Sequence, residues 1–359
     1  MIQTKMHFIH EEVQLNSKLN DNIISYAPLN FKKDTSVICM TDKGKLLEIS
    51  LSQNQFSEIA DISDKIELSL EVCIHISPDE SLCAVVNKFG RTGVVIELIN
   101  GNILMSLLRD DYHYDVTTFP ITFFEVEGKQ FLIHGTQWNR LDISDPITGE
   151  LYTKRTLPKF DIKNRDDRYL DYFHSSLSIS PNSRWIIDNG WVWHPAGVLY
   201  RWDARKWLSE NIWESENGLS KKEITWCDGL WDRPICWISD TQLIVWGFGN
   251  DDEITFEPSL SIFDIDTCKE IKRLNGISGF LVFDKYLFSI VPSKILDVCG
   301  LRGYEKHFER RGISVWDVVN GHELLHEAEI SPNLYHFGSK AFVTYLGNGR
   351  FMISRLVEK

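Results

Sequence analysis

The sequence predicts an all-β fold built from repeated four-stranded sheets, and three observations support this prediction. Short runs of β-branched and aromatic residues recur along all 359 residues, separated by Gly, Asn, Asp and Pro. Long helical periodicity is nearly absent, and the best helical candidate is the short segment 203–213. One kind of strand, an apolar run that ends near an acidic residue, recurs six times along the chain.

The acidic residue marks the length of the repeat. Its successive spacings are 49, 45, 61, 61 and 53 residues, for Glu48, Glu97, Asp142, Asp203, Asp264 and Asp317. Most of these acids are followed by a turn and a second alternating strand. A turn of the Ser-Pro-Asp type precedes several of them, in the segments 75–86, 178–188 and 237–246. A four-stranded unit of about 50 residues is the period expected of propeller blades.

This order of strands and turns resembles the WD40 family and its more divergent bacterial relatives. Two segments carry the Trp-Asp pair of that family, "YRWDARKW" (200–207) and "VWDVVNGHEL" (315–324). The resemblance covers nearly the whole chain, although no Gly-His pair opens each repeat. It implies that one face of the propeller carries the loops between second and third strands and the connections to the next blade.

The two ends of the chain predict the number of blades. After the sixth unit, residues 333–356 provide about three strands, and residues 6–15 form a lone strand at the start. Pairing these two segments completes a seventh blade and hides sheet edges that would otherwise seek other chains. We therefore expect a single propeller domain over residues 1–359, with six or eight blades as alternatives. The approximate blades are 22–62, 70–108, 116–157, 172–214, 232–274, 277–329, and 332–359 with 6–15.

Composition and charge argue against several classes of partner. The chain has 38 basic and 51 acidic residues, a net charge of −13, which disfavours nucleic acid. No segment approaches the ~18 apolar residues of a membrane span, and the start lacks the apolar core of a signal peptide. Seven cysteines without C-x-x-C spacing suggest buried free thiols in a reducing compartment. We expect a cytoplasmic monomer that binds neither nucleic acid nor membrane.

Motifs for common chemistries are absent from the sequence. It contains no G-x-S-x-G elbow, P-loop, dinucleotide-binding glycine motif or H-E-x-x-H. Segment 249–257 has oxygen ligands but lacks the order of a calcium loop, so we expect no metal and no cofactor. The loop 300–312 is locally basic and is interpreted either as a clamp for an acidic partner or as a solvated insertion.

Large rings crowd the segment 184–203, which contains four tryptophans. Trp185 and Trp202 fit core strands. The predicted loop 188–197 carries Trp191, Trp193 and His194, bracketed by Gly and Pro, which restrict its shape. A rigid loop rich in rings can form a binding platform. The alternative is that these rings plug the top of the central channel.

Neighbouring loops of blades 2 to 5 combine acids, bases and rings in the same sector. Such a mixture suits a cationic peptide, a sugar or another polar ligand, whereas Asp-Arg-His clusters also commonly satisfy one another and the backbone. The candidate binding residues are Asp111, His113, Trp138, Asn139, Arg140, Asp167, Arg168, His174, Trp191, Trp193, His194, Trp231, Asp232 and Arg233.

Two functions follow from these patterns. The leading one is a non-catalytic module that binds a protein or a small polar ligand through the loop face of blades 2 to 5. The other is a hydrolase or lyase with an acid–base site in the central funnel. The groups available for such chemistry are Asp111, His113, Asp167 and His174.

Overall fold

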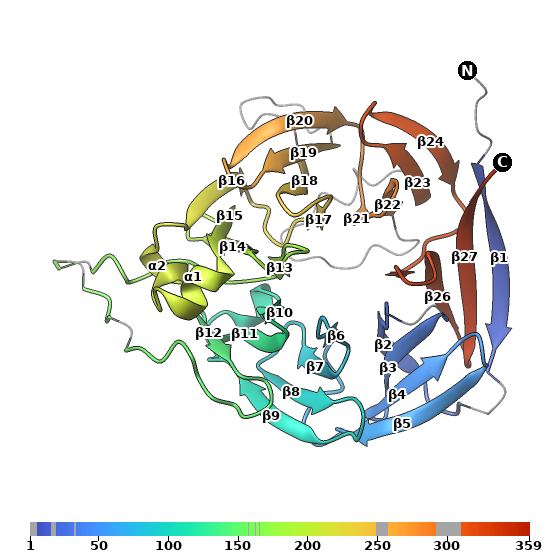
Figure 1. Ribbon diagram of the computed structural model, residues 1–359, viewed down its shortest axis with the longest axis horizontal. Coiled ribbons are helices and arrows are strands. Elements are labelled where there is room, and N and C mark those ends of the chain that lie inside the picture. Colours follow the sequence, from blue (N-terminus) through green and yellow to red (C-terminus); the bar gives the residue numbers. More distant parts are fainter. Residues whose placement is uncertain are drawn as a thin grey trace.

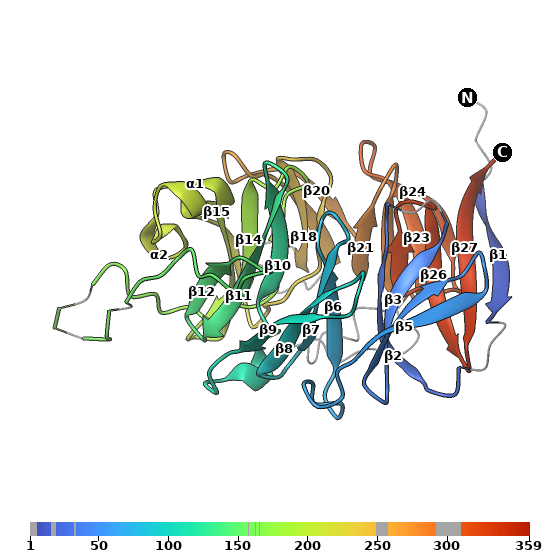
Figure 2. The same cartoon turned by 60° about the horizontal axis from the view of Figure 1, so that its bottom comes forward.

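The computed structural model describes residues 6–15, 19–31, 34–156, 158–161, 163–164, 166–248, 258–291 and 310–359. In these residues the strands form seven antiparallel sheets arranged as a ring (Figure 1). The strands run from one face of the ring to the other (Figure 2). The basic loop and the acidic segment 249–257 fall wholly or mostly outside the described residues.

In the first six sheets the strand order follows the chain, from the centre of the ring outward (Figure 1). The first two sheets contain β2 (Ile23–Pro28), β3 (Ser36–Thr41), β4 (Lys45–Ser50), β5 (Gln55–Asp61), β6 (Val72–Ile76), β7 (Leu82–Asn87), β8 (Thr92–Glu97) and β9 (Ile103–Leu108). The third and fourth contain β10 (Ile121–Val126), β11 (Lys129–Gln137), β12 (Arg140–Ser144), β13 (Leu177–Ile179), β14 (Trp185–Val192), β15 (Ala196–Asp203) and β16 (Lys222–Asp228).

The fifth and sixth sheets follow the same plan, and the seventh takes its outermost strand from the N-terminal end of the described chain. The fifth and sixth contain β17 (Ile235–Trp237), β18 (Gln242–Phe248), β19 (Pro258–Asp264), β20 (Lys269–Asn275), β21 (Phe280–Phe283), β22 (Leu287–Val291), β23 (Gly312–Asp317) and β24 (His322–Glu327). The seventh contains β25 (Leu334–His336), β26 (Ala341–Gly347), β27 (Arg350–Glu358) and β1 (Met6–Gln14). The predicted seven-bladed ring is confirmed.

The N-terminal strand closes the ring as predicted. β1 pairs antiparallel with β27 along its whole length, placing Phe8 opposite Leu356 and Val13 opposite Phe351. Phe8 and Val13 are both buried, so the strand contributes core side chains as well as backbone hydrogen bonds. In Figure 1, β1 and β27 lie side by side at the right of the ring.

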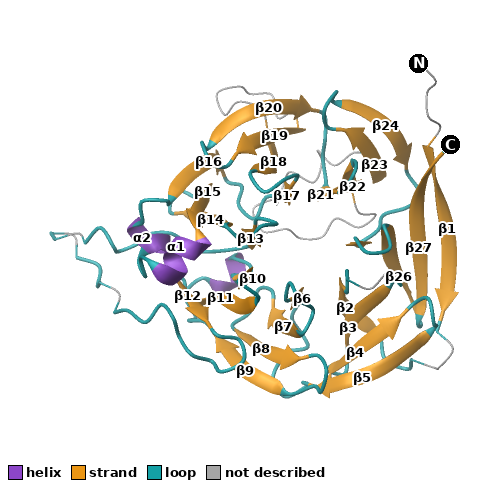
Figure 3. Ribbon diagram, in the orientation of Figure 1, coloured by secondary structure: helices purple, strands orange, loops and turns teal. Residues whose placement is uncertain are grey.

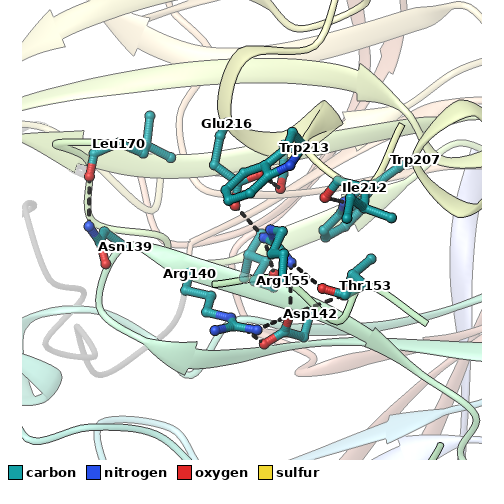
Figure 4. Close-up of polar contacts among 12 residues, drawn as sticks. Asn139, Arg140, Asp142, Thr153, Arg155, Leu170, Trp207, Ile212, Trp213 and Glu216 are labelled. Carbon is teal, nitrogen blue, oxygen red and sulfur yellow. Dashed lines mark hydrogen bonds and ion pairs between the residues drawn. The ribbon is translucent and has the colours of Figure 1, made fainter. Parts of the chain in front are cut away.

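The third sheet departs from the expected four strands. Within the described residues it has three strands, and the edge of β12 is satisfied by the segment that follows it. The N–H of Tyr152 bonds to the carbonyl of Ile143, and the hydroxyl of Thr153 accepts from the Ile143 N–H, at 2.9 Å each. Arg155 Nη2 donates to the Leu141 carbonyl at 2.9 Å. Side chains thus replace part of a strand (Figure 4).

Arg155 also joins this edge to the fourth sheet. Its guanidinium pairs with Asp142 at 2.9 Å and with Glu216, and all three side chains are buried (Figure 4). The ring of Trp213 lies 5.5 Å from the guanidinium carbon. A buried arginine needs hydrogen-bond and ionic partners, and these residues engage both terminal nitrogens of Arg155, whereas its Nε has no partner among the described residues.

The predicted boundary of the fourth blade, 172–214, is wrong. Two short helices, α1 (Ala204–Ser209) and α2 (Glu214–Asn217), are inserted between its third and fourth strands on the outside of the ring (Figure 3). Its outer strand β16 lies beyond them, between the predicted bounds of the fourth and fifth blades. Asp203 ends β15 and caps α1 by accepting from the N–H groups of Arg205 and Lys206 at 3.0 and 3.1 Å.

The acidic marker has a local function at the end of several third strands. Asp264 accepts from the Thr267 N–H at 2.8 Å, and Asp317 from the Asn320 N–H at 3.1 Å, so each starts a turn. In the third sheet Asp145 makes these turn bonds instead of Asp142. Asp142 had been chosen as the marker, but it is committed to the buried arginine.

Hydrophobic clusters fill the spaces between neighbouring sheets. One of them combines residues of the fourth and fifth sheets, including Trp185 and Ile187 from β14 with Leu243 and Val245 from β18. Trp185 and Trp202 are 4% and 0% exposed, which confirms that they belong to the core. No helix in the described part of the chain is long and apolar enough to cross a bilayer.

Candidate functional site

A column of four rings runs through one sector of the propeller. Tyr112 stacks on Phe173 with centroids 5.8 Å apart, Phe173 on Trp191 at 4.1 Å, and Trp191 on Trp231 at 5.2 Å. Adjacent planes are inclined by only 17°, 10° and 24°. We call Tyr112, Phe173, Trp191 and Trp231 the ring column. It joins side chains from blades 2 to 5.

The backbone fixes the middle of the ring column. Phe173 and Trp191 form an isolated antiparallel bridge, with two N–H···O bonds of 2.8 and 3.1 Å. The indole N–H of Trp231 donates to the carbonyl of Val116 at 2.9 Å. The stacking therefore depends on connections that are hydrogen-bonded to neighbouring segments.

Two glycines allow these connections to approach the strands. A Cβ atom on Gly190 would lie 2.0 Å from the carbonyl oxygen of Phe173, and one on Gly197 would lie 1.8 Å from that of Leu230. Real Cβ atoms do not come so close to a backbone oxygen, so both positions require glycine. Gly190 and Gly197 thus bring the chain on either side of the Trp191 indole into stacking range.

The expected loop 188–197 is much shorter than predicted. β14 continues to Val192 and β15 starts at Ala196, so only residues 193–195 form the turn. Trp191 therefore belongs to a strand and is 5% exposed, whereas Trp193 in the turn is 42% exposed. His194 is exposed and takes a left-handed φ of 105°, which tightens this turn.

Three further rings surround the outer end of the column. Trp138, in the turn between β11 and β12, lies 4.5 Å from Phe173. Trp193 meets Phe173 edge-on at 5.2 Å, and His113 meets Trp193 edge-on at 5.3 Å. Edge-to-face and offset contacts of this kind are favourable between aromatic rings. The rings hold one another in place.

A hollow of about 370 Å³ opens beside these rings. The residues that line it come from two turns and two connections between blades: Tyr112, Trp138, Phe160, Tyr169, Asp171 and Trp193. We call this the aromatic hollow. Tyr112 is 45% exposed and Phe160 60% exposed, so the hollow is open to a ligand.

Asp110 connects the two segments that carry Tyr112 and Trp138. Burial raises the pKa of its carboxyl group, and the backbone N–H groups of Trp138 and Tyr112 oppose this increase by bonding to the carboxylate. The backbone N–H of Asp110 donates to the carbonyl of Thr136 at 3.2 Å. Asp110 therefore fixes the backbone of Tyr112 and Trp138, two residues whose rings line the aromatic hollow.

No protein-family model matches the chain, and no curated protein matches its sequence. Solved structures do match its fold. A chain in the "Crystal Structure of Mitotic Checkpoint Complex" gives a TM-score of 0.58 at 12% identity, covering 97% of this chain and 93% of that one. The structure of the RRP9 WD40 repeats gives 0.55 at 10% identity, covering 97% and 98%. This chain has the fold of WD40-repeat propellers.

On this WD40-like propeller the aromatic hollow lies where two kinds of loop meet. Trp138 and Trp193 occupy turns between second and third strands, whereas Tyr112 and Asp171 occupy connections between blades. These are the loop classes that the resemblance placed on one face. The structure thus brings together the predicted rings Trp138, Trp191, Trp193 and Trp231 with His113.

Several predicted polar residues instead hold the WD40-like scaffold together. Asn139 is buried and donates to the Leu170 carbonyl at 2.8 Å, while Arg140 pairs with Asp142 at 2.7 Å (Figure 4). Arg168 pairs with Asp166 at 2.6 Å on the exposed connection between blades 3 and 4. Arg140 and Arg168 thus pair with residues two positions away, whereas Asn139 links its turn to the connection between blades 3 and 4.

His174 is buried and is bonded to a strand of the fourth sheet. Its Nδ1 lies 2.5 Å from Asp188, and both side chains are buried. The hydroxyl of Tyr172 donates to the Val198 carbonyl at 2.8 Å and accepts from the N–H of Gly190 at 2.6 Å. These groups form a structural polar network inside blade 4.

Asp232 links the connections that enter blades 3, 4 and 5. It accepts from the hydroxyls of Ser175 at 2.7 Å and Thr118 at 3.2 Å, and from the N–H of Ser176 at 3.0 Å. Burial raises the pKa of Asp232, and these donors oppose that increase. Arg233, next in sequence, is 5% exposed.

The groups proposed for acid–base chemistry are not assembled. Within the residues that the structure describes, no hydrogen bond joins any two of Asp111, His113, Asp167 and His174. Asp111 and Asp167 are exposed, and His113 packs against rings. The same residues contain no group of three His, Cys, Asp or Glu side chains placed to hold a metal ion.

Sequence reasoning missed four rings that build the site, namely Tyr112, Phe160, Tyr169 and Phe173. Tyr112 lies in the charged segment 109–115, and Tyr169 and Phe173 lie in the charged segment 164–174. Phe160 lies just before the latter, in the same predicted connection 158–174. The sequence signal that could have identified these residues was an aromatic residue next to each group of charged residues.

Proposed function

We propose that this WD40-like propeller is a non-catalytic binding module that holds a protein partner on the ring-bearing face of blades 2 to 5. One observation carries the proposal: Trp193 and Tyr112 remain 42% and 45% exposed although both are packed against fixed neighbouring rings. An exposed ring that is already held in place loses little conformational entropy on binding. Trp and Tyr in such positions are the residues that dominate protein interfaces.

A macromolecular partner fits the extent of the exposed apolar surface. Phe160, on the long connection between blades 3 and 4, is 60% exposed and lies 5.4 Å from Tyr169. Apolar side chains grouped around a hollow are typical of recognition surfaces. The matching chain from the mitotic checkpoint complex is part of a protein complex, and this supports a scaffold role for the same fold.

The separation of the acid–base groups favours binding over catalysis. A general acid–base pair must reach one reacting group, directly or through one water. His174 is 2% exposed and already bonded to Asp188, while Asp111 and Asp167 lie in exposed loops. These positions support a recognition surface.

The experiment compares two exposed-ring variants in quantitative pull-downs from the native cells. Tyr112→Ala combined with Trp193→Ala removes rings that line the aromatic hollow. Trp226→Ala is the matched control, because Trp226 is 46% exposed on β16 and lies outside the hollow. We expect the double variant to lose a specific partner by at least about tenfold and the control to retain it.

Circular dichroism and thermal unfolding show whether each variant is folded. Trp191→Ala is unsuitable for this comparison, because a 5% exposed ring in the middle of the column contributes to stability. Equal recovery of every partner by the wild type, the double variant and the control would show that this face is not the binding surface.

A further inference from the structure

The aromatic hollow combines rings with a single carboxylate. Tyr112 and Trp138 are inclined by 57° with centroids 5.4 Å apart, and Tyr112 and Trp193 by 68° at 6.5 Å. Rings inclined at these angles form walls with different directions rather than a flat stack. The faces of aromatic rings carry negative electrostatic potential, so walls of this kind attract a positive charge.

Asp171 provides the only charge among the described residues that line the hollow. Its side chain is exposed, and within the described residues no hydrogen bond or ion pair engages its carboxylate. None of the described lining residues is basic, so no cation among them neutralises Asp171. The nearby Arg168 is committed to Asp166 at 2.6 Å. A positive ligand would therefore find an unpaired carboxylate.

The overall charge of the protein also favours a positively charged ligand. With 51 acidic and 38 basic residues, the chain carries a net charge of −13 and attracts cations from solution. An anionic ligand would be repelled both by this field and by Asp171. A neutral sugar could stack on the rings but would gain little from an unpaired carboxylate.

We propose that the aromatic hollow binds a methylated ammonium group, presented on the partner as the end of a side chain. This inference rests on the proposed function, because it names the chemistry of the group that the same face recognises. A cation over Trp or Tyr rings gains cation–π attraction, and Asp171 adds a direct charge interaction.

Methylation follows from the scarcity of acceptors in the hollow. A primary ammonium group has three N–H donors, and each must keep a partner when the group leaves water. The described lining offers one carboxylate and otherwise ring faces or edges and the two tyrosine hydroxyls. Methyl groups replace the N–H donors while keeping the charge. A methylated ammonium group therefore loses fewer hydrogen bonds to water when it enters the hollow. The hollow, at about 370 Å³, lies near the lower end of the range of small-ligand pockets.

The probe for this proposal is choline, compared with 3,3-dimethylbutan-1-ol, its uncharged isostere. The two molecules have the same shape, so a difference in affinity reports the charge alone. Binding is followed by ¹H–¹⁵N NMR of the tryptophan indole groups in the full-length protein. Trp138 and Trp193 line the hollow, whereas Trp226 serves as an internal control. Each signal is assigned by its loss in the corresponding single Trp→Phe variant.

We expect choline to shift the Trp138 and Trp193 signals saturably and to leave Trp226 unchanged. The isostere should bind about tenfold more weakly, and added salt should weaken choline binding. Asp171→Asn should lower choline affinity by roughly five- to tenfold and bring it close to that of the isostere. Asp167→Asn is the matched control, because it removes an exposed carboxylate of the same connection that does not line the hollow, and it should change the affinity little.

Three results would overturn the inference: no shift of Trp138 or Trp193 at tens of millimolar choline, equal affinity for the isostere, or unchanged affinity in Asp171→Asn. The two proposals fail separately. Loss of a protein partner in the ring variants without choline binding would keep the binding-module function and reject the cation. Choline binding without any ring-dependent partner would keep the cation site and reject the protein-binding face.

Discussion

Phe173 and Trp191 stack with their ring centroids 4.1 Å apart and their planes inclined by 10°, and their backbones exchange two hydrogen bonds. This pair joins the connection before blade 4 to the second strand of that blade. It divides the tryptophans of the sector into two kinds: Trp191 is buried at 5% exposure, and Trp193, two residues later, is 42% exposed. The tryptophan-rich segment 184–203 therefore contributes side chains both to the buried core and to the exposed surface.

Trp191→Ala should destabilise the propeller strongly, and Trp193→Ala should not. Removing the buried indole leaves a large cavity between Phe173 and Trp231, and such changes cost about 3–5 kcal/mol of unfolding free energy. The exposed indole of Trp193 should cost at most about 1 kcal/mol. Urea unfolding of both variants, followed by circular dichroism, measures the difference. Similar losses in the two variants would contradict the division between core and surface.

The blade count and the closing strand could be predicted because both depend on local sequence patterns. After six repeats, the strand predicted in 6–15 and the strands predicted in 333–356 were left without a complete sheet. Pairing them completes a ring, and β1 pairs with β27 accordingly. The outer strand of blade 4 could not be placed. The insertion of α1 and α2 delays β16 to Lys222–Asp228, and a strand that follows helices is easily taken for a connection.

The candidate site was predicted as a sector but not as a set of contacts. Trp193 and Trp138 were identified because they stand in segments that the sequence predicted to be loops of one face. Phe173 was missed because stacking depends on which connections meet in space. His174 and Asp232 were predicted to contact a ligand, but both form hydrogen bonds inside the protein, to Asp188 and to the Ser175 hydroxyl. Acidic and basic side chains in connections commonly bind buried hydroxyl and backbone groups in this way.

Glu216→Ala should destabilise the protein by about 3 kcal/mol, because it leaves the buried Arg155 with only Asp142 as an anionic partner (Figure 4). Asp166→Ala is the matched control. It removes the partner of Arg168 in an exposed pair, and such pairs contribute at most about 1 kcal/mol. Thermal and urea unfolding give both values. A loss in Glu216→Ala no larger than that of the control would mean that the pair does not hold α2 to the third sheet.

Deleting residues 1–14 should destabilise the ring and promote self-association. The deletion removes the partner of β27 along Arg350–Glu358 and leaves an open sheet edge that can pair with another chain. Size-exclusion chromatography with light scattering measures the association. Glu11→Ala with Glu12→Ala is the control, because it removes only the exposed ion pairs to Arg355 and Arg350. A truncated chain that matches the wild type in stability and mass would contradict the role of β1 in closing the ring.

Lys221→Met should stabilise the protein at neutral pH. Burial lowers the pKa of Lys221 from 10.5 to about 8, and the charges of Asp188 and Glu216 oppose only part of this decrease. Between these two values the unfolded chain holds a proton that the folded chain has released, so the free energy of unfolding rises with pH across this window. Below about pH 8 the ammonium is charged in both states, and its desolvation destabilises the fold.

The expected gain at neutral pH is on the order of 2 kcal/mol. It is smaller than the full pKa difference implies, because methionine loses the hydrogen bond from Lys221 Nζ to the Glu216 carbonyl at 3.2 Å and the contact with the Tyr200 ring at 4.6 Å. Urea unfolding of the wild type and Lys221→Met at pH values from neutral to about 10.5 isolates the contribution of this lysine. The advantage of the variant should shrink as the pH rises through the window, because the wild-type lysine then becomes neutral in the folded state. A difference between the two proteins that stays constant with pH would show that Lys221 titrates normally and is not desolvated.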